Sequence, residues 1–177
     1  MREQVYAWLV RYLSSEEENS KDKKMTPKDI QQLLKNENAT LFLMIWSIME
    51  QKIFDGFMKK KDIDMAAECF TGYYQELDIN DIFLHFHRRY QNKETCRHLK
   101  HGDKNDKFDE ILKMQEDKIA DKEKMTFLFY VVYRYRNNIF HGNKGIESWS
   151  QFTEQITYCI QFMTKIIDYW PINKGEC

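Results

Sequence analysis

The chain has 177 residues, a formal net charge of −1 and an aromatic content of 15%. This length suits one domain with a buried core, and the balanced charge excludes a global attraction to nucleic acid, so any such attraction has to come from a local patch. Two prolines and six glycines permit long helices and argue against a β architecture, which needs many turns.

The N-terminal part predicts two short helices separated by a polar connector. Apolar residues recur there at spacings of three and four, which is typical of an amphipathic helix: they are Val5, Trp8, Leu9, Tyr12 and Leu13. A polar, charge-mixed connector is expected near residues 14–25. Thr26 as an N-cap and Pro27 at the first helical position predict a second helix that ends near Lys35.

Residues 41–57 are apolar almost all round, and a helix of that kind belongs inside the molecule. Glu50 lies in its middle. Because a buried carboxylate without a partner is costly, we expect Glu50 to face a cation or a hydrogen-bond donor. The longest apolar run, residues 41–49, is too short to span a bilayer, so no membrane partner is expected.

Two further helices are predicted over residues 63–76 and 79–90. Residues 91–107 then carry almost no apolar side chain and form the one local basic excess, so we expect a basic loop there. A modest surface helix is expected over residues 108–115.

The next helix is expected from about residue 122 to 139, with Asp121 as its cap. Its centre is rich in β-forming residues, but its length, the acidic cap and the lack of a partner strand favour a helix. Gly142 and Gly145 end it.

The last helix has one apolar face, from Trp149 to Trp170, and stops at Pro171. Together these patterns predict an all-α helical bundle of about six to eight helices. A single domain is expected over residues 1–177.

The cysteine pattern indicates a reducing compartment. The four cysteines, Cys69, Cys96, Cys159 and Cys177, form no Cys-x-x-Cys pair, and a chain of this size does not need disulfides. Charged residues interrupt any apolar region at the N-terminus, so no signal peptide is expected. The sequence therefore predicts a cytoplasmic protein.

The most informative stretch is residues 136–141, where Arg136, two asparagines and His141 follow an apolar helix. Arginine is a planar, permanently charged fork suited to phosphate, and histidine exchanges protons near neutral pH. Five residues correspond to about 140° on a regular helix, so His141 reaches Arg136 only if the helix ends between them. The pair is a minimal set for metal-free RNA cleavage, in which a base activates the ribose 2′-OH and a cation stabilises the transition state.

Simpler interpretations of this stretch stay open. Basic residues near a helix C-terminus are favourable in any protein, so Arg136 and His141 could form a plain cap. Asn137 could equally be a capping residue or a residue that holds the geometry of the site.

Residues 136–142, Arg-Asn-Asn-Ile-Phe-His-Gly, resemble the Arg-x4–6-His motif of the HEPN superfamily. The resemblance implies an all-α bundle and, as in many members, a metal-independent endoribonuclease from a toxin–antitoxin, CRISPR or phage-defence system. It also implies a homodimer in which two copies of the motif line one cleft. No metal or cofactor is implied.

The resemblance assigns roles to individual residues. His141 would be the general base or acid, and Arg136 would stabilise the transition state. Residues 41–50 resemble the earlier core helix of the family, so Glu50 would orient Arg136, with Asn137 also supporting the site. Asn143 stands where members regulated by a nucleotidyltransferase often carry a tyrosine, which puts that mode of regulation in doubt.

The implied partners are RNA, a second copy of the chain and an antitoxin or another defence-system protein. Basic side chains that could hold the RNA backbone are Arg88, Arg89, Arg97 and Lys100. The alternatives are a non-catalytic module that binds a nucleotide or partner protein, and a zinc module built on Cys96, His98 and His101. The zinc alternative lacks recognisable ligand spacing, and no metal site is predicted.

Overall fold

The computed structural model describes residues 37–54, 56–140 and 152–170. Over these ranges the protein forms seven α-helices and no strand, which confirms the predicted all-α bundle. The helices predicted at residues 5–13 and after Thr26, and the connector near residues 14–25, lie outside the described residues. No helix within the described ranges combines the length and apolar character needed to cross a membrane.

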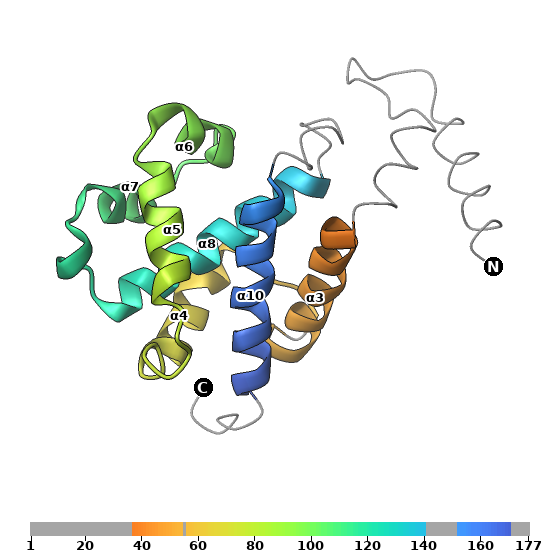
Figure 1. The fold of residues 1–177 in the computed structure, drawn as a ribbon. Coiled ribbons are helices and arrows are strands. Elements are labelled where there is room, and N and C mark those ends of the chain that lie inside the picture. Colours follow the sequence, from red (N-terminus) through yellow and green to blue (C-terminus); the bar gives the residue numbers. More distant parts are fainter. Residues whose placement is uncertain (1–36, 55, 141–151, 171–177) are drawn as a thin grey trace, which may run out of the picture.

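The helices pack around α8 (Asp121–Phe140), which crosses the middle of the bundle in Figure 1. On one side lies α3, on the other lie α5, α6 and α7, and α10 runs between α3 and α5. The most extensive pairings join α3 to α10 and α4 to α8. The other elements are α3 (Glu37–Ile53), η1 (Lys60–Asp62), α4 (Ile63–Thr71), α5 (Asn80–Tyr90), α6 (Lys93–Lys100), α7 (Asp106–Lys113), η2 (Glu116–Lys118) and α10 (Thr153–Tyr169).

Burial on every side explains why the β-rich centre of α8 is helical. Residues 127–132 are at most 1% exposed. Phe127 stacks on Phe108 of α7 with ring centroids 4.8 Å apart, and Phe129 meets Phe162 of α10 edge to face at 5.1 Å. Because neighbours surround the helix, an apolar sequence without a polar face is stable there.

The basic segment 91–107 differs from the loop that the sequence predicts, because it contains α6. The side chain of Asn92 caps this helix by accepting hydrogen bonds from the N–H groups of Glu94 and Thr95, both at 3.0 Å. Leu99 is the one buried residue of α6. Most of its other side chains are charged or polar, so the sequence of this segment resembles that of a solvated loop.

The limits of several other helices differ by a few residues from those that the sequence predicts. α3 begins at Glu37 and ends at Ile53, and α4 ends at Thr71, before Gly72. α7 begins at Asp106, and its Phe108 is only 1% exposed, so this helix contributes to the core and is more than a surface element. The expected positions of α5 and α10 agree with the structure over the described residues.

Candidate active site at the end of α8

Arg136 projects from α8 toward α3 and the turn that follows it. Its guanidinium carbon lies 5.8 Å from the centre of the Trp46 ring and 5.9 Å from that of Phe57. Its Nη1 donates a hydrogen bond to the amide oxygen of Asn137 at 3.1 Å. Cation–π contacts of this kind hold a guanidinium in place while its planar fork keeps its charge.

Glu50 organises the turn that carries Phe57. Its carboxylate accepts a hydrogen bond from the backbone N–H of Met58 at 3.1 Å. Its carbonyl oxygen accepts two more, from the N–H groups of Phe54 and Gly56, both at 3.0 Å. The expected donor for this half-buried carboxylate is therefore a backbone amide. Since Phe57 adjoins Met58, Glu50 helps to place one of the two rings beside Arg136.

The structure brings Glu50, Arg136 and Asn137 to the same end of the molecule. Trp46 is one turn before Glu50 on α3 and touches Arg136, so the two predicted partners share a neighbour. The direct pairing of the Glu50 carboxylate with the Arg136 guanidinium stays a prediction. Asn137 accepts from Arg136, a contact that positions the arginine side chain.

His141 directly follows Phe140, the last residue of α8, and lies outside the described residues. Gly142 and Asn143 lie outside them as well. The helix continues past Asn138, so the predicted helix end falls at the far limit of the expected range. The return of His141 toward Arg136 stays a prediction.

On the opposite face of α8, Arg134 and Asn138 hold the end of α6 in place. Asn138 donates to the Leu99 carbonyl at 3.0 Å, and Arg134 donates to the Lys100 carbonyl at 2.8 Å. Arg134 also reaches the amide oxygen of Asn138 at 3.3 Å. These two side chains satisfy carbonyls that the end of α6 leaves without helical partners. Sequence reasoning missed this role, although the spacing of four residues already places both side chains on one face of α8.

Asp103 connects the turn after α6 to η1 and to α8. Its two carboxylate oxygens accept hydrogen bonds from Lys60 Nζ and from the hydroxyl of Tyr130, both at 2.8 Å. Partial burial raises the pKa of Asp103, but the hydrogen bonds from Lys60 and Tyr130 outweigh burial, so the net pKa is lowered. Burial raises the pKa of Tyr130, and its bond to Asp103 adds to the effect.

Asp103→Asn is expected to lower the free energy of unfolding by about 2 kcal/mol at pH 7, because hydrogen bonds to a charged group are lost. The pKa of Asp103 is lower in the folded state than in the unfolded state, where it is near 4. The charged carboxylate therefore stabilises the fold fully above that unfolded-state pKa. This stabilisation disappears as the pH falls through the folded-state pKa. Urea denaturation at several pH values should show the two proteins converging below about pH 4. A difference that stays constant across pH would contradict this role.

Three of the four predicted RNA-binding side chains contact other parts of the protein. Arg88 forms two hydrogen bonds of 2.8 Å with Glu116, and Lys100 Nζ bonds Asp109 at 2.7 Å. Arg89 lies over the ring of Phe152, 5.9 Å from its centre. Arg97 is exposed and has no ion-pair partner in the described part of the chain. It is therefore the one whose charge is most available to an external anion.

The histidines and cysteines are dispersed. His85 stacks on Tyr158 of α10 at 4.2 Å, whereas His87 points to the other side of α5, toward the Ile111 carbonyl. His98 pairs with Glu94 on the surface of α6. Over residues 37–54, 56–140 and 152–170, no three His, Cys, Asp or Glu side chains are grouped to hold a metal ion.

Comparison with known proteins adds no relative: no family model, curated protein or solved structure matches the chain. The motif at residues 136–141 and the geometry around Arg136 are therefore the features that indicate a function.

Proposed function

We propose that the protein is a metal-independent endoribonuclease of the HEPN type that works as a homodimer. The observation that carries the proposal is the placement of Arg136. Its guanidinium is positioned by Trp46, Phe57 and Asn137 near the end of a helix whose centre is buried, five residues before His141. An arginine fixed by aromatic rings is pre-organised for a phosphate, and the histidine five residues later in the sequence can supply the proton transfer that RNA cleavage requires.

The reaction is an internal transfer of the phosphodiester. His141 takes the proton of the ribose 2′-OH, and the 2′-oxygen attacks the adjacent phosphorus while the bond to the 5′-oxygen breaks. The leaving oxygen gains a proton. The products are a 2′,3′-cyclic phosphate and a 5′-hydroxyl end. Arg136 stabilises the charge that builds up on the phosphoryl oxygens, and this electrostatic stabilisation is often the largest single contribution to catalysis.

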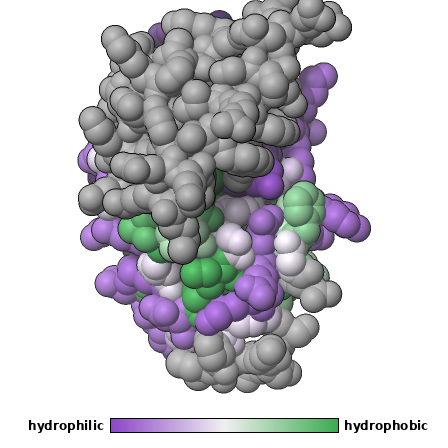
Figure 2. All heavy atoms as spheres, turned by 90° about the vertical axis from the view of Figure 1, so that its right-hand side faces the viewer, coloured by the Kyte–Doolittle hydropathy of each residue, from purple (hydrophilic) through white to green (hydrophobic). Residues whose placement is uncertain are grey.

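An apolar surface on α3 supports the homodimer. Leu41, Met44 and Ile48 recur at helical spacing and are 43%, 60% and 42% exposed; we call them the α3 stripe. Phe57, which touches Arg136, is 55% exposed. Figure 2 looks onto the α3 side of the molecule and shows hydrophobic residues at its surface. An exposed apolar stripe of this kind marks an interaction site, at which a second copy of the chain can dock.

The proposal is tested by incubating RNA with the purified protein in EDTA. Cleavage is expected to persist and to yield 2′,3′-cyclic phosphate ends. His141→Ala should slow it about 100-fold or more, since a general acid–base residue contributes that much. The matched control is His98→Ala, whose side chain is 53% exposed on α6, and it should cleave like the wild type.

Three results would overturn the proposal. Cleavage that survives His141→Ala would point to a contaminating nuclease, and cleavage abolished by EDTA would point to a metal-dependent reaction. If the wild type leaves RNA intact and binds it through Arg136, the non-catalytic module is the correct function.

A further inference from the structure

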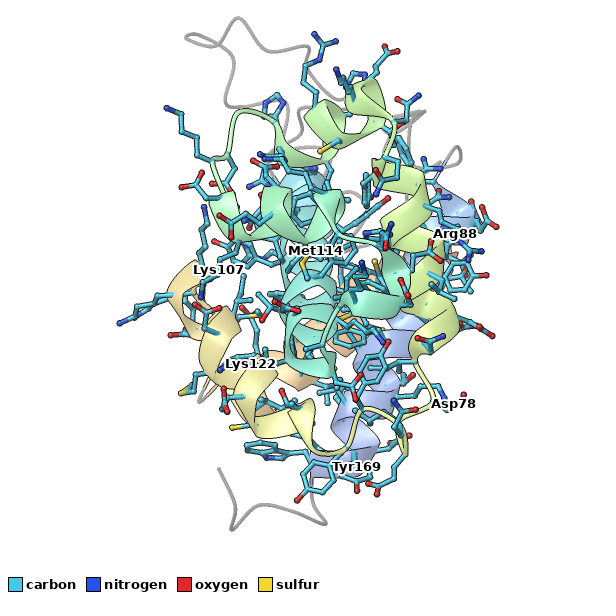
Figure 3. All side chains as sticks on the ribbon, turned by 90° about the vertical axis from the view of Figure 1, so that its left-hand side faces the viewer. Asp78, Arg88, Lys107, Met114, Lys122 and Tyr169 are labelled. Atoms are coloured by element: carbon cyan, nitrogen blue, oxygen red, sulfur yellow. The ribbon has the colours of Figure 1, made fainter. Side chains whose placement is uncertain are left out.

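A cavity of about 940 Å³ lies between α5, α6 and α7, away from Arg136. Its volume is within the range of small-molecule sites, roughly 300–1,000 Å³. Figure 3 looks onto this side, with Met114 near the centre of the view and Arg88 toward its edge. Neither Arg136 nor Glu50 lines it, so it is distinct from the proposed active site.

The acidic residues of the cavity are neutralised by cations of the same molecule. Asp109 pairs with Lys100 at 2.5 Å. Asp103 pairs with Lys60 at 2.8 Å. Glu116 pairs with Arg88, also at 2.8 Å. The cavity therefore presents little net negative charge of its own.

Three other lining cations stay uncompensated. Lys93, Arg97 and Lys113 are exposed and form no ion pair with any described residue. Lys93 and Arg97 are four residues apart, so they project from the same face of α6. A guanidinium fork beside an ammonium group is suited to phosphate oxygens. The cavity is thus positive at its α6 wall.

The inner wall is formed by His87 and by apolar side chains. His87 is 3% exposed, and its Nε2 donates to the Ile111 carbonyl at 3.2 Å. Its buried Nδ1 faces a carboxylate oxygen of Glu116 at 3.8 Å. Leu112 and Met114 add apolar surface beside it.

We infer that this cavity binds a nucleoside phosphate. The phosphate groups contact Lys93 and Arg97, and the base lies against Leu112 and Met114. This ligand matches both walls: its phosphates are anions for the cations of α6, and its base is a flat body for the apolar surface. The inference does not depend on whether the α8 site cleaves RNA.

Isothermal titration of the full chain with ADP tests the inference. Lys93→Ala and Arg97→Ala should each weaken ADP binding about tenfold, and the double variant should weaken it further. Both side chains are exposed, so these changes leave the fold intact. Lys118→Ala, an exposed cation outside the cavity, is the matched control and should bind like the wild type.

Two further measurements place the ligand. Adenosine, which lacks phosphate, should bind equally to the wild type and to Arg97→Ala, whereas pyrophosphate binding should be lost with ADP binding in the double variant. Arg136→Ala should retain the affinity for ADP. The inference is wrong if ADP does not bind, if the double variant binds it as tightly as the wild type, or if Arg136→Ala abolishes binding.

Discussion

Arg136→Lys is expected to slow RNA cleavage about 100-fold, and Arg136→Ala by about 100-fold to 1,000-fold, the cost of removing one group that stabilises transition-state charge. Lysine keeps the positive charge and an aliphatic stem that can pack on Trp46 and Phe57, but it loses the planar fork that contacts two phosphate oxygens. The measurement is the single-turnover rate with a fluorescent RNA, alongside thermal unfolding of each variant.

Arg134 provides the matched control, two residues earlier on the same helix. Its guanidinium caps α6 and does not face Trp46, so Arg134→Lys should reduce the free energy of unfolding by about 1 kcal/mol and change cleavage little. The proposed role of Arg136 would be refuted by unchanged cleavage in Arg136→Lys. A rate loss in Arg134→Lys as large as that in Arg136→Lys would also refute it, since the effect would then come from the fold.

The sequence predicts the helices that contact the core, because the arrangement of their apolar residues indicates a buried helix. α10 shows a continuous apolar face, and the centre of α8 is apolar all round. α6 was missed for a physical reason. It buries only Leu99. Its first turn is capped by the Asn92 side chain, and its last carbonyls bind Arg134 and Asn138 of α8, which are far away in the sequence. A short helix that is stabilised by side chains of another element needs few apolar residues of its own, so its sequence resembles a loop.

The sequence indicates which residue types form the candidate site, but it indicates less well which partners their side chains contact. The expectation that Glu50 needs a donor is sound, yet the observed donor is the Met58 amide, because a turn returns the backbone to the carboxylate. The partners of the basic residues are equally hard to predict from the sequence. Glu116 lies 28 residues beyond Arg88, and no local pattern links the two. Side-chain partners across helices follow from packing, which the sequence alone does not display.

The contacts on two faces of α8 join these observations into one arrangement. Arg136 faces α3, Arg134 and Asn138 hold the end of α6, and Tyr130 binds Asp103 in the turn that follows α6. The helix that carries the motif is therefore fixed on either side in the absence of any ligand. Such pre-organisation is what electrostatic stabilisation of a transition state requires.

Met44 lies in the α3 stripe, the proposed dimer interface. Met44→Glu is expected to convert the proposed dimer to a monomer and to abolish cleavage. Met44 is 60% exposed in one copy, so a glutamate there costs the monomer little, whereas in a dimer interface it would be a buried, unpaired charge. Light scattering after size exclusion and the RNA assay measure the two consequences on the same sample.

Met65→Glu is the matched control, because Met65 is 58% exposed on α4 and lies outside the stripe. It introduces the same charge in place of the same side chain, so it should leave both the dimer and its cleavage rate unchanged. A Met44→Glu protein that remains dimeric and active would exclude the stripe as the interface. A wild type that is monomeric and unfolds more readily after Met44→Glu would instead show that the stripe is covered by residues of its own chain. The exposed methionines of α3 and α4 therefore separate assembly from surface charge, since only Met44 belongs to the α3 stripe.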